Sequence, residues 1–417
     1  MKKTVNHILA AGLLALLSLA SCTDEFIEGN DLQGVDRDKR VEVRLPFGVG
    51  RGITTTITTR AAGGEIDYDS QLSGVMAFVY EAKSDNPEEN ELLAYHLFSN
   101  PSNKPLEGAT GGWNADNDDP TCGEIKFYVP VGDVYIYLLG NAQSSFLNFF
   151  PGVSGGDALG TQAEFFEKAT PKWNGNIHSV DGYLPLTGMV NNNTGLCHVN
   201  EQGQISYTDE EGKTHTLLPD GKHDEDNSFV LKRLMSKITM NIREGKGVKF
   251  TARDYTVRHI PHYVSPTAQA WTEEERDRIL VEDAKPVNFG LLDSLTFTIY
   301  LPENIRKVRP GVEITEYRQR DKVVKTADNK NTEETAPDDF HADNADNHKG
   351  HYKFEFAPKA STYIELTGWF ENADKTVAAD VRYYIHLGNF GKDLNHFSVE
   401  RDHHYTYNVT INGVDDI

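Results

Sequence analysis

Two pairs of histidines have the residue type that binds metal ions or transfers protons. His259 and His262 are spaced like metal ligands, but Pro261 lies between them and no third or fourth ligand follows at a known interval. His403 and His404 are adjacent and lie in a predicted turn, where we interpret them as solvated side chains. We therefore predict no metal site at either pair.

Oxygen-bearing side chains occur once with the spacing of a calcium loop. Asn114, Asp116 and Asp118 resemble its first alternating ligands, but the required glycine and distal glutamate are missing, so we interpret them as a surface loop. The sequence contains no glycine-rich phosphate loop and no Gly-x-Ser-x-Gly elbow. Because nothing assembles an acid, a base or a nucleophile, we predict no catalytic residues, no cofactor and no enzymatic activity.

The N-terminus offers a different chemistry, which is covalent modification of a cysteine. Lys2 and Lys3 precede an apolar run over residues 8–20, which is the order of a secretory signal and is too short to span a membrane comfortably. The run ends in Leu-Ala-Ser before Cys22, a pattern that looks like a bacterial lipobox. We predict that residues 1–21 are a lipoprotein signal peptide and that Cys22 is lipidated. The alternative is a plain signal peptide with an incidental cysteine.

A β-strand is predicted soon after this signal. Alternation over residues 41–49 places five apolar side chains on one face: Val41, Val43, Leu45, Phe47 and Val49. Burial of that face contributes roughly 7–15 kcal/mol as an upper bound, comparable to the roughly 5–15 kcal/mol stability of a whole domain. Pro46 lacks an N–H donor, which favours an edge position in a sheet.

A linker of mostly threonine and glycine is predicted after the strand, and it leads to Arg60 and Ala61. Small residues surround Arg60, so we expect its side chain to be exposed. A strand that contributes this much to stability is thus followed by a basic residue that we expect to be exposed, which raises the question of a special role for Arg60. The alternative interpretation is an ordinary linker arginine.

Length and composition indicate two domains. Removal of the signal leaves roughly 395 residues, which is too many for one ordinary core. The formal net charge of -22 repels phosphate backbones, so nucleic acid is a poor candidate partner. Cys122 and Cys197 could form one disulfide or remain two buried thiols, and the sequence leaves both possibilities open.

Most of the chain after residue 66 has the pattern of short β-strands, separated by clusters of Gly, Asn, Asp and Pro. Residues 229–242 are predicted to form one long strand or a pair of strands. Many short strands with turn signals between them favour β-sandwiches. We predict an all-β protein with two tandem sandwich domains, over residues 61–228 and 229–417.

Short helices are expected in two connections between strands. Thr161 and Glu164 have the spacing of a capping box, and so do Thr272 and Glu275. In such a box the threonine hydroxyl and the glutamate carboxylate satisfy N–H groups at the start of a helix.

Several stretches together resemble the FimA/Mfa-like fimbrillins of Bacteroidetes, which are lipoprotein precursors of type V pili. The lipobox, a polar tether with Asp24 and Glu25 at its start, and Thr-Arg-Ala at residues 59–61 occur in the family's order. Four further stretches are similar to family segments, at residues 129–142, 184–190, 229–238 and 397–411. Together they cover nearly the whole chain.

This resemblance implies a fold of two transthyretin-like (Greek-key) sandwiches and a role as a structural pilus subunit that supports adhesion. It implies export to the outer-membrane surface as a lipoprotein, and then a cut between Arg60 and Ala61 by an Arg-specific surface protease. Residues 22–60 would be the tether and a removable strand, which a neighbouring pilus subunit replaces by donor-strand exchange. Arg40 and Arg51 are rival cut sites, but a cut after Arg40 leaves the strand in place.

A second interpretation is an uncut surface lipoprotein, either a pilus anchor or a module that binds a glycan or a host protein. Only residues 412–417 follow Ile411, whereas stalk subunits of the family need a C-terminal segment to donate. The sequence therefore leaves open a stalk, a tip or an anchor role, and it does not identify an adhesion target.

Overall fold

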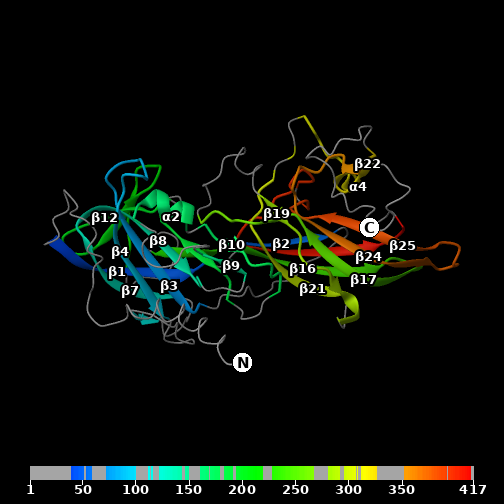
Figure 1. Ribbon diagram of the computed structural model, residues 1–417, viewed down its shortest axis with the longest axis horizontal. Helices are drawn as coiled ribbons and strands as arrows, with labels where there is room; N and C mark the ends of the chain where they lie inside the picture. The colour runs from blue at the N-terminus through cyan, green and yellow to red at the C-terminus, as the bar shows by residue number, and fades with distance from the viewer. Residues whose placement is uncertain are drawn as a thin grey trace, which may run out of the picture.

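The computed structural model describes residues 39–50, 53–58, 72–99, 111–112, 114–115, 122–142, 146–149, 160–168, 170–178, 183–190, 194–218, 228–266, 280–291, 295–306, 308, 311–325, 352–391 and 393–414. The described residues are mostly β-strand, so the expected all-β class is confirmed. The division into two transthyretin-like sandwiches stays a prediction. Figure 1 shows the strands in a left and a right half of the molecule.

The left half contains a twelve-stranded sheet, which we call sheet 1. Its main path runs β14-β13-β12-β8-β11-β15-β1-β7-β6, and β3, β4 and β5 extend from β8. The strands are β1 (Arg40–Val49), β3 (Gly74–Glu81), β4 (Leu92–Ser99), β5 (Gly111–Gly112), β6 (Asn114–Ala115), β7 (Cys122–Pro130), β8 (Gly132–Gly140), β11 (Leu186–Gly188), β12 (Leu196–Val199), β13 (Ile205–Thr208), β14 (Thr214–Thr216) and β15 (Phe229–Arg233).

The right half contains two four-stranded sheets. Sheet 2 has the order β2 (Ile53–Thr58), β26 (His403–Ile411), β16 (Met235–Glu244) and β21 (Thr296–Pro302). Sheet 3 has the order β20 (Val287–Asn288), β17 (Val248–Arg258), β24 (Tyr363–Asn372) and β25 (Ala378–His386). Sheets 2 and 3 bury their apolar faces in one cluster, where the rings of Tyr255 and Phe297 stack with centroids 4.0 Å apart.

Smaller elements complete the described chain. Two-stranded sheets form from β9 (Leu147–Asn148) with β10 (Lys172–Trp173), β18 (Ile260–Pro261) with β19 (Val281–Glu282), and β22 (Val323–Lys325) with β23 (Tyr352–Phe354). The helices are α2 (Gln162–Lys168), α4 (Tyr317–Arg320) and the 3₁₀ turn η2 (Phe289–Leu291).

The capping box before α2 is confirmed. The Thr161 N–H donates to Glu164 Oε2 over 3.1 Å, and the Glu164 N–H donates to Thr161 Oγ1 over 3.2 Å. The second predicted box, at Thr272 and Glu275, lies outside the described residues.

The predicted linker after β1 is wrong for residues 53–58, because they form β2 and pair in parallel with β26. The run Ile-Thr-Thr-Thr-Ile-Thr is entirely β-branched, and such side chains suit a pleated strand. The prediction of solvated histidines is also wrong, since His404 is fully buried at the start of β26 and its ring contacts Thr239 Oγ1 at 3.0 Å.

Two chain segments cross between sheet 1 and sheet 2. The first crossing joins β1 to β2, and the second joins β15 to β16 through Leu234. Of the two alternatives predicted for residues 229–242, the pair of strands is confirmed, and the two strands lie in different sheets. The proposed domain boundary at 228/229 stays a prediction, and β15, which follows it, pairs with β1 and β11.

Candidate functional site

The first strand, β1, buries its apolar face in the core of sheet 1. The side chains of Val43, Leu45 and Phe47 are fully buried. Val41 and Val49, at the two ends of the strand, are partly buried and pack against the same cluster. Because successive side chains point to opposite faces of a strand, one register places all five in this core.

The backbone of β1 is bonded unequally on its two sides. It pairs antiparallel with β7 along all but its last residue, from Arg40 opposite Pro130 to Gly48 opposite Cys122. It pairs in parallel with β15 only over its last three residues, from Phe47 opposite Phe229 to Val49 opposite Leu231. The predicted edge position is therefore wrong for the end of the strand, where β1 lies between two neighbours.

Pro46 occupies the last position before this two-sided pairing begins, opposite Glu124 of β7. A proline cannot donate to a ladder, so it is tolerated where only one neighbour is paired. The order of residues in β1 thus matches the change from one partner strand to two.

One ion pair ties the other face of β1 to β7. Arg44 donates from Nε to Glu124 Oε1 and places Nη2 2.8 Å from Glu124 Oε2, which is a two-pronged contact. The Glu124 side chain is buried, and Lys126 Nζ lies 3.7 Å from its Oε1. Departure of β1 would leave a buried carboxylate with a weaker cationic neighbour, which is an unfavourable state.

A glycine turn lies against the start of β1. Gly203, in the turn between β12 and β13, has a φ of +74°. A Cβ placed on it would lie 2.1 Å from the Glu42 carbonyl oxygen. Only glycine suits this position, because it tolerates the positive φ and allows such close approach of two backbones.

The end of β1 leads into a buried junction. The Gly50 N–H donates to the Leu231 carbonyl over 2.9 Å, and the Gly50 carbonyl accepts from Arg233 Nη1 over 2.8 Å. The same Nη1 lies 2.7 Å from Asp402 Oδ1. Burial raises the pKa of Asp402, and the Arg233 guanidinium acts against that rise.

Beyond the junction, β2 lies at the edge of sheet 2. Its partner β26 runs parallel to it, from Ile53 opposite His403 to Thr58 opposite Asn408. Residues 40–58 therefore form one bipartite segment, which we call the strap: β1 completes sheet 1 and β2 extends sheet 2. In Figure 1, β2 lies in the right half, apart from β1 in the left half.

The residues expected to be modified or cut are not among the described residues. Cys22, Arg60 and Ala61 fall outside the described residues. Cys122 and Cys197 are described, and both are buried thiols without a disulfide. Burial raises the pKa of the Cys197 thiol, which holds it in the neutral form.

His259 and His262 have structural contacts, whereas Asp116 and Asp118 of the candidate calcium loop lie outside the described residues. Nδ1 of His259 lies 3.2 Å from the Ser361 carbonyl oxygen. Burial lowers the pKa of His259 to about 4. His262 pairs through Nδ1 with Glu282. Among the described residues, no group of three or more His, Cys, Asp or Glu could hold a metal ion. In the same part of the chain, no helix has the length and apolar character needed to cross a membrane.

The strap is bound to the rest of the described chain through backbone pairing and side-chain contacts. Its recognition elements are a row of main-chain groups on β7, a short parallel row on β15, and a second parallel row on β26. The Arg233–Asp402 ion pair contacts the strap at Gly50, between β1 and β2. Sequence reasoning found the apolar face of β1 but missed β2, Glu124 and the junction. The clue to the junction is a single arginine within the apolar run of residues 229–242.

Residues 299–409 match the family model of a domain of unknown function, DUF4906. The match begins within β21 and ends within β26. A comparison with curated proteins gives no match.

The expected resemblance to FimA/Mfa-like fimbrillins is confirmed as a similarity to solved structures. The tip fimbrial protein Mfa3 of Porphyromonas gingivalis, with a C-terminal truncation, aligns with a TM-score of 0.41 and 12% identity, over 88% of this chain and 94% of that one. A candidate cell adhesion protein of Parabacteroides distasonis gives a TM-score of 0.47 and 9% identity, over 90% and 92% of the two chains.

A candidate cell adhesion protein of Bacteroides eggerthii is also similar, with a TM-score of 0.40 and 12% identity over 92% of this chain and 89% of that one. Because these TM-scores all lie below 0.5, we take neither the topology nor the function of the protein from them.

Proposed function

We propose that the protein is a structural subunit of a cell-surface pilus that polymerises by donor-strand exchange and supports adhesion. It is exported as a lipoprotein anchored through Cys22, and an Arg-specific surface protease cuts it between Arg60 and Ala61. Two tandem transthyretin-like sandwiches form its body. Its partners are other pilus subunits, and it has no catalytic role and needs no cofactor.

The observation that carries this proposal is the strap. A segment near the N-terminus fills a deep apolar site with three fully buried side chains, and it is bonded to strands from distant parts of the sequence. A single cut after it would detach it from the chain without breaking any other strand.

The energetic consequence favours replacement of the strap. Three buried side chains at about 1.5–3 kcal/mol each contribute about 5–9 kcal/mol as an upper bound. Loss of the strap also leaves new unpaired edges on β7 and β15 in sheet 1 and on β26 in sheet 2, and unpaired strand edges bind extended peptides. The emptied site would thus bind a strand from another subunit in preference to remaining open.

The position of the cut decides what is released. A cut after Arg60 frees both β1 and β2, whereas a cut after Arg51 would free β1 and leave β2 attached to the body of the protein. We expect the first, because it opens both sheets at once.

The alternative role is an uncut surface lipoprotein, acting as a pilus anchor or as a binding module for a glycan or host protein. It is favoured by the position of β26, which lies between β2 and β16 and is not a free donor strand. In the alternative role the strap stays in place permanently.

The experiment that separates the two roles is determination of the mature N-terminus, by peptide mass spectrometry of protein from washed cell surfaces. A start at Ala61 supports the pilus subunit. A lipidated start at Cys22, with residues 40–58 still attached, rejects strand exchange into this protein. A start at residue 52 would mean that β1 alone is exchanged.

A further inference from the structure

Three segments from distant parts of the chain meet where the strap crosses between sheets. They are Gly50, the end of β15 at Arg233, and Asp402 just before β26. The Asp402 N–H donates to the Met235 carbonyl over 3.2 Å, so Asp402 also binds the first residue of β16. The crossing is thus a built contact between the two halves of the protein.

Arg233 is the centre of this crossing. Its side chain is 1% exposed, although it carries a permanent charge. Nη1 reaches both Asp402 Oδ1 and the Gly50 carbonyl oxygen, and Asp402 Oδ1 also accepts from the Arg233 N–H over 3.2 Å. A buried guanidinium needs its acceptors, so the strap carbonyl is a part of the environment that makes this charge tolerable.

Neighbouring atoms of Val230, Asp402 and Leu231 limit the space for a side chain at Gly50. A Cβ on Gly50 would lie 3.1 Å from Val230 Cγ1, 3.5 Å from Asp402 Oδ2 and 3.6 Å from the Leu231 carbonyl oxygen. The first contact is tighter than ordinary van der Waals contact, and a larger side chain would add atoms towards Val230 and Asp402. The crossing therefore accepts glycine and resists branched side chains.

The two registers fix the direction and the spacing of any replacement. A strand that replaces the strap must run parallel to β15 and to β26 at the same time. Gly50 follows β1 directly and precedes β2 by three residues, so its counterpart occupies one defined position in the replacing segment.

We propose that Arg233 and Asp402 select the replacing strand through the residue that takes the place of Gly50, which we call the crossing residue. The partner is an extended segment of another polypeptide, with alternating apolar residues over its first nine or so positions, a glycine at the crossing and a β-branched second half. The glycine carbonyl binds Arg233 and thereby sets the register of both halves. This inference rests on the proposed function, because it requires the strap to leave.

The test is strand exchange into the full-length protein after cutting by an Arg-specific protease. The protease is removed, a dye-labelled synthetic peptide of residues 40–58 is added in excess, and its incorporation is followed by size-exclusion chromatography and mass spectrometry. A second peptide carries Gly50→Val. A matched control peptide carries Glu42→Val, because Glu42 is exposed on the same strand.

We expect the natural and Glu42→Val peptides to enter equally well, and the Gly50→Val peptide to bind at least about tenfold more weakly. We expect a similar loss for the natural peptide with the Arg233→Lys protein, since lysine lacks the fixed fork of donors. Thermal unfolding of the uncut Arg233→Lys protein checks that this variant folds. If it does not fold, the comparison of the Gly50→Val and Glu42→Val peptides on the natural protein tests the proposal.

The possible results are distinguishable. If the natural peptide does not enter the cut protein, strand exchange fails and both proposals are overturned. If it enters but the Gly50→Val and Glu42→Val peptides bind equally, the selection at the crossing is overturned and strand exchange stands.

Discussion

Individual residues of the strap site perform distinct tasks. Phe47 fills the core, Arg44 compensates the buried charge of Glu124, and Gly50 allows the chain to cross to the second sheet. Because each residue has a different task, a single substitution should remove one of these contributions and leave the others in place. Two further residues, Gly203 and His259, give predictions that belong to this scale.

Replacement of Gly203 by alanine should weaken the contact between the β12–β13 turn and β1. The added Cβ would collide with the Glu42 carbonyl, and alanine is strained at a φ of +74°. We expect a loss of about 2–3 kcal/mol in unfolding free energy, measured by denaturant titration.

Gly212→Ala is the matched control, because Gly212 has a φ of +81° and nothing lies within 4 Å of its Cβ position. It bears only the backbone strain, which is about 1 kcal/mol. Equal losses in the two variants would mean that the approach to Glu42 costs nothing.

His259 should make the protein less stable in mild acid. Burial lowers its pKa to about 4, with the Asp283 carboxylate acting against the shift and His386 and Arg306 adding to it. Since the folded pKa is below the unfolded value of about 6.5, protons bind the unfolded state first as the pH falls. Stability is therefore complete above pH 6.5 and falls by about 3 kcal/mol towards pH 4.

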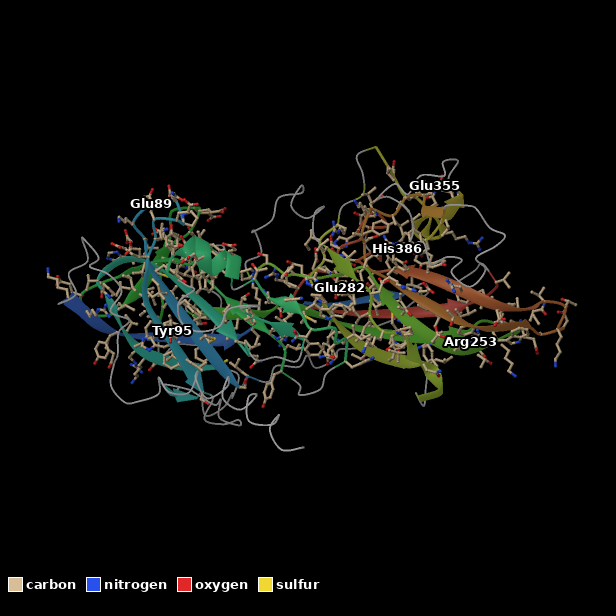
Figure 2. All side chains as sticks on the ribbon, in the orientation of Figure 1. Glu89, Tyr95, Arg253, Glu282, Glu355 and His386 are labelled. Atoms are coloured by element: carbon tan, nitrogen blue, oxygen red, sulfur yellow. The ribbon has the colours of Figure 1, made fainter. Side chains whose placement is uncertain are left out.

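His259→Asn tests this, because asparagine tolerates the φ of 58° at this position. In urea titrations between pH 6.5 and 4, the slope of unfolding free energy against pH should decrease by about 1.4 kcal/mol per unit. The control is His198→Asn, since His198 is exposed. Figure 2 places His386, a neighbour whose pKa burial also lowers, in the right half; its contribution should remain in the variant.

At the scale of elements, β1 is the strand on which the proposed function depends. It connects β7 to β15, so sheet 1 is continuous only while β1 is present. Its five apolar residues were recognisable from their alternation alone, because a strand with one buried face has a period of two. Its partner strands were not, since pairing between residues about 80 and 180 positions apart leaves no local signal.

Phe47→Ala should loosen β1 most strongly. The side chain is fully buried, and truncation of such a phenylalanine costs about 3–5 kcal/mol. Val49→Ala, at the partly buried end of the same strand, should cost clearly less. Thermal unfolding of the two uncut variants makes the comparison, and a larger loss for Val49→Ala would contradict the burial of β1.

β2 shows that amino-acid composition alone can predict a linker where the chain forms a strand. Threonine and glycine suggested a linker, but the stretch from Ile53 to Thr58 is wholly β-branched and carries a real strand signal. His404 was misjudged for another reason: the predicted turn ends at Asp402, and β26 begins at His403, so His404 lies within a strand and its side chain is buried. The Arg233–Asp402 junction joins residues 169 apart in the sequence, so sequence patterns alone did not place these two residues together.

At the scale of the whole molecule, the strap links sheets in both halves. Its removal should therefore affect the two halves together, even though they have separate sheets. The described pairing of β1 is confined to sheet 1 and that of β2 to sheet 2, so sheet 3 serves as an internal reference.

Hydrogen–deuterium exchange of the cut and stripped protein should show this coupling. We expect faster exchange in β7 and in β26, because each loses a paired neighbour. Exchange at the β24–β25 pairing should not change, because among the described strands neither β24 nor β25 pairs with β1 or β2. Unaltered protection of β26 would indicate that β2 stays behind when β1 leaves.

The alignment of the strap along its partner strands also has a mechanical consequence. The strap is antiparallel to β7, where the hydrogen bonds lie across the strand direction, and parallel to β26, where they are slanted but evenly spaced. A pull along the axis of a strand in this site would therefore shear many bonds to β7 and β26 at once, rather than unzip them one by one. An incoming strand that is tethered at one end would resist such a load along both sheets, so the two-part site would suit a joint that bears tension.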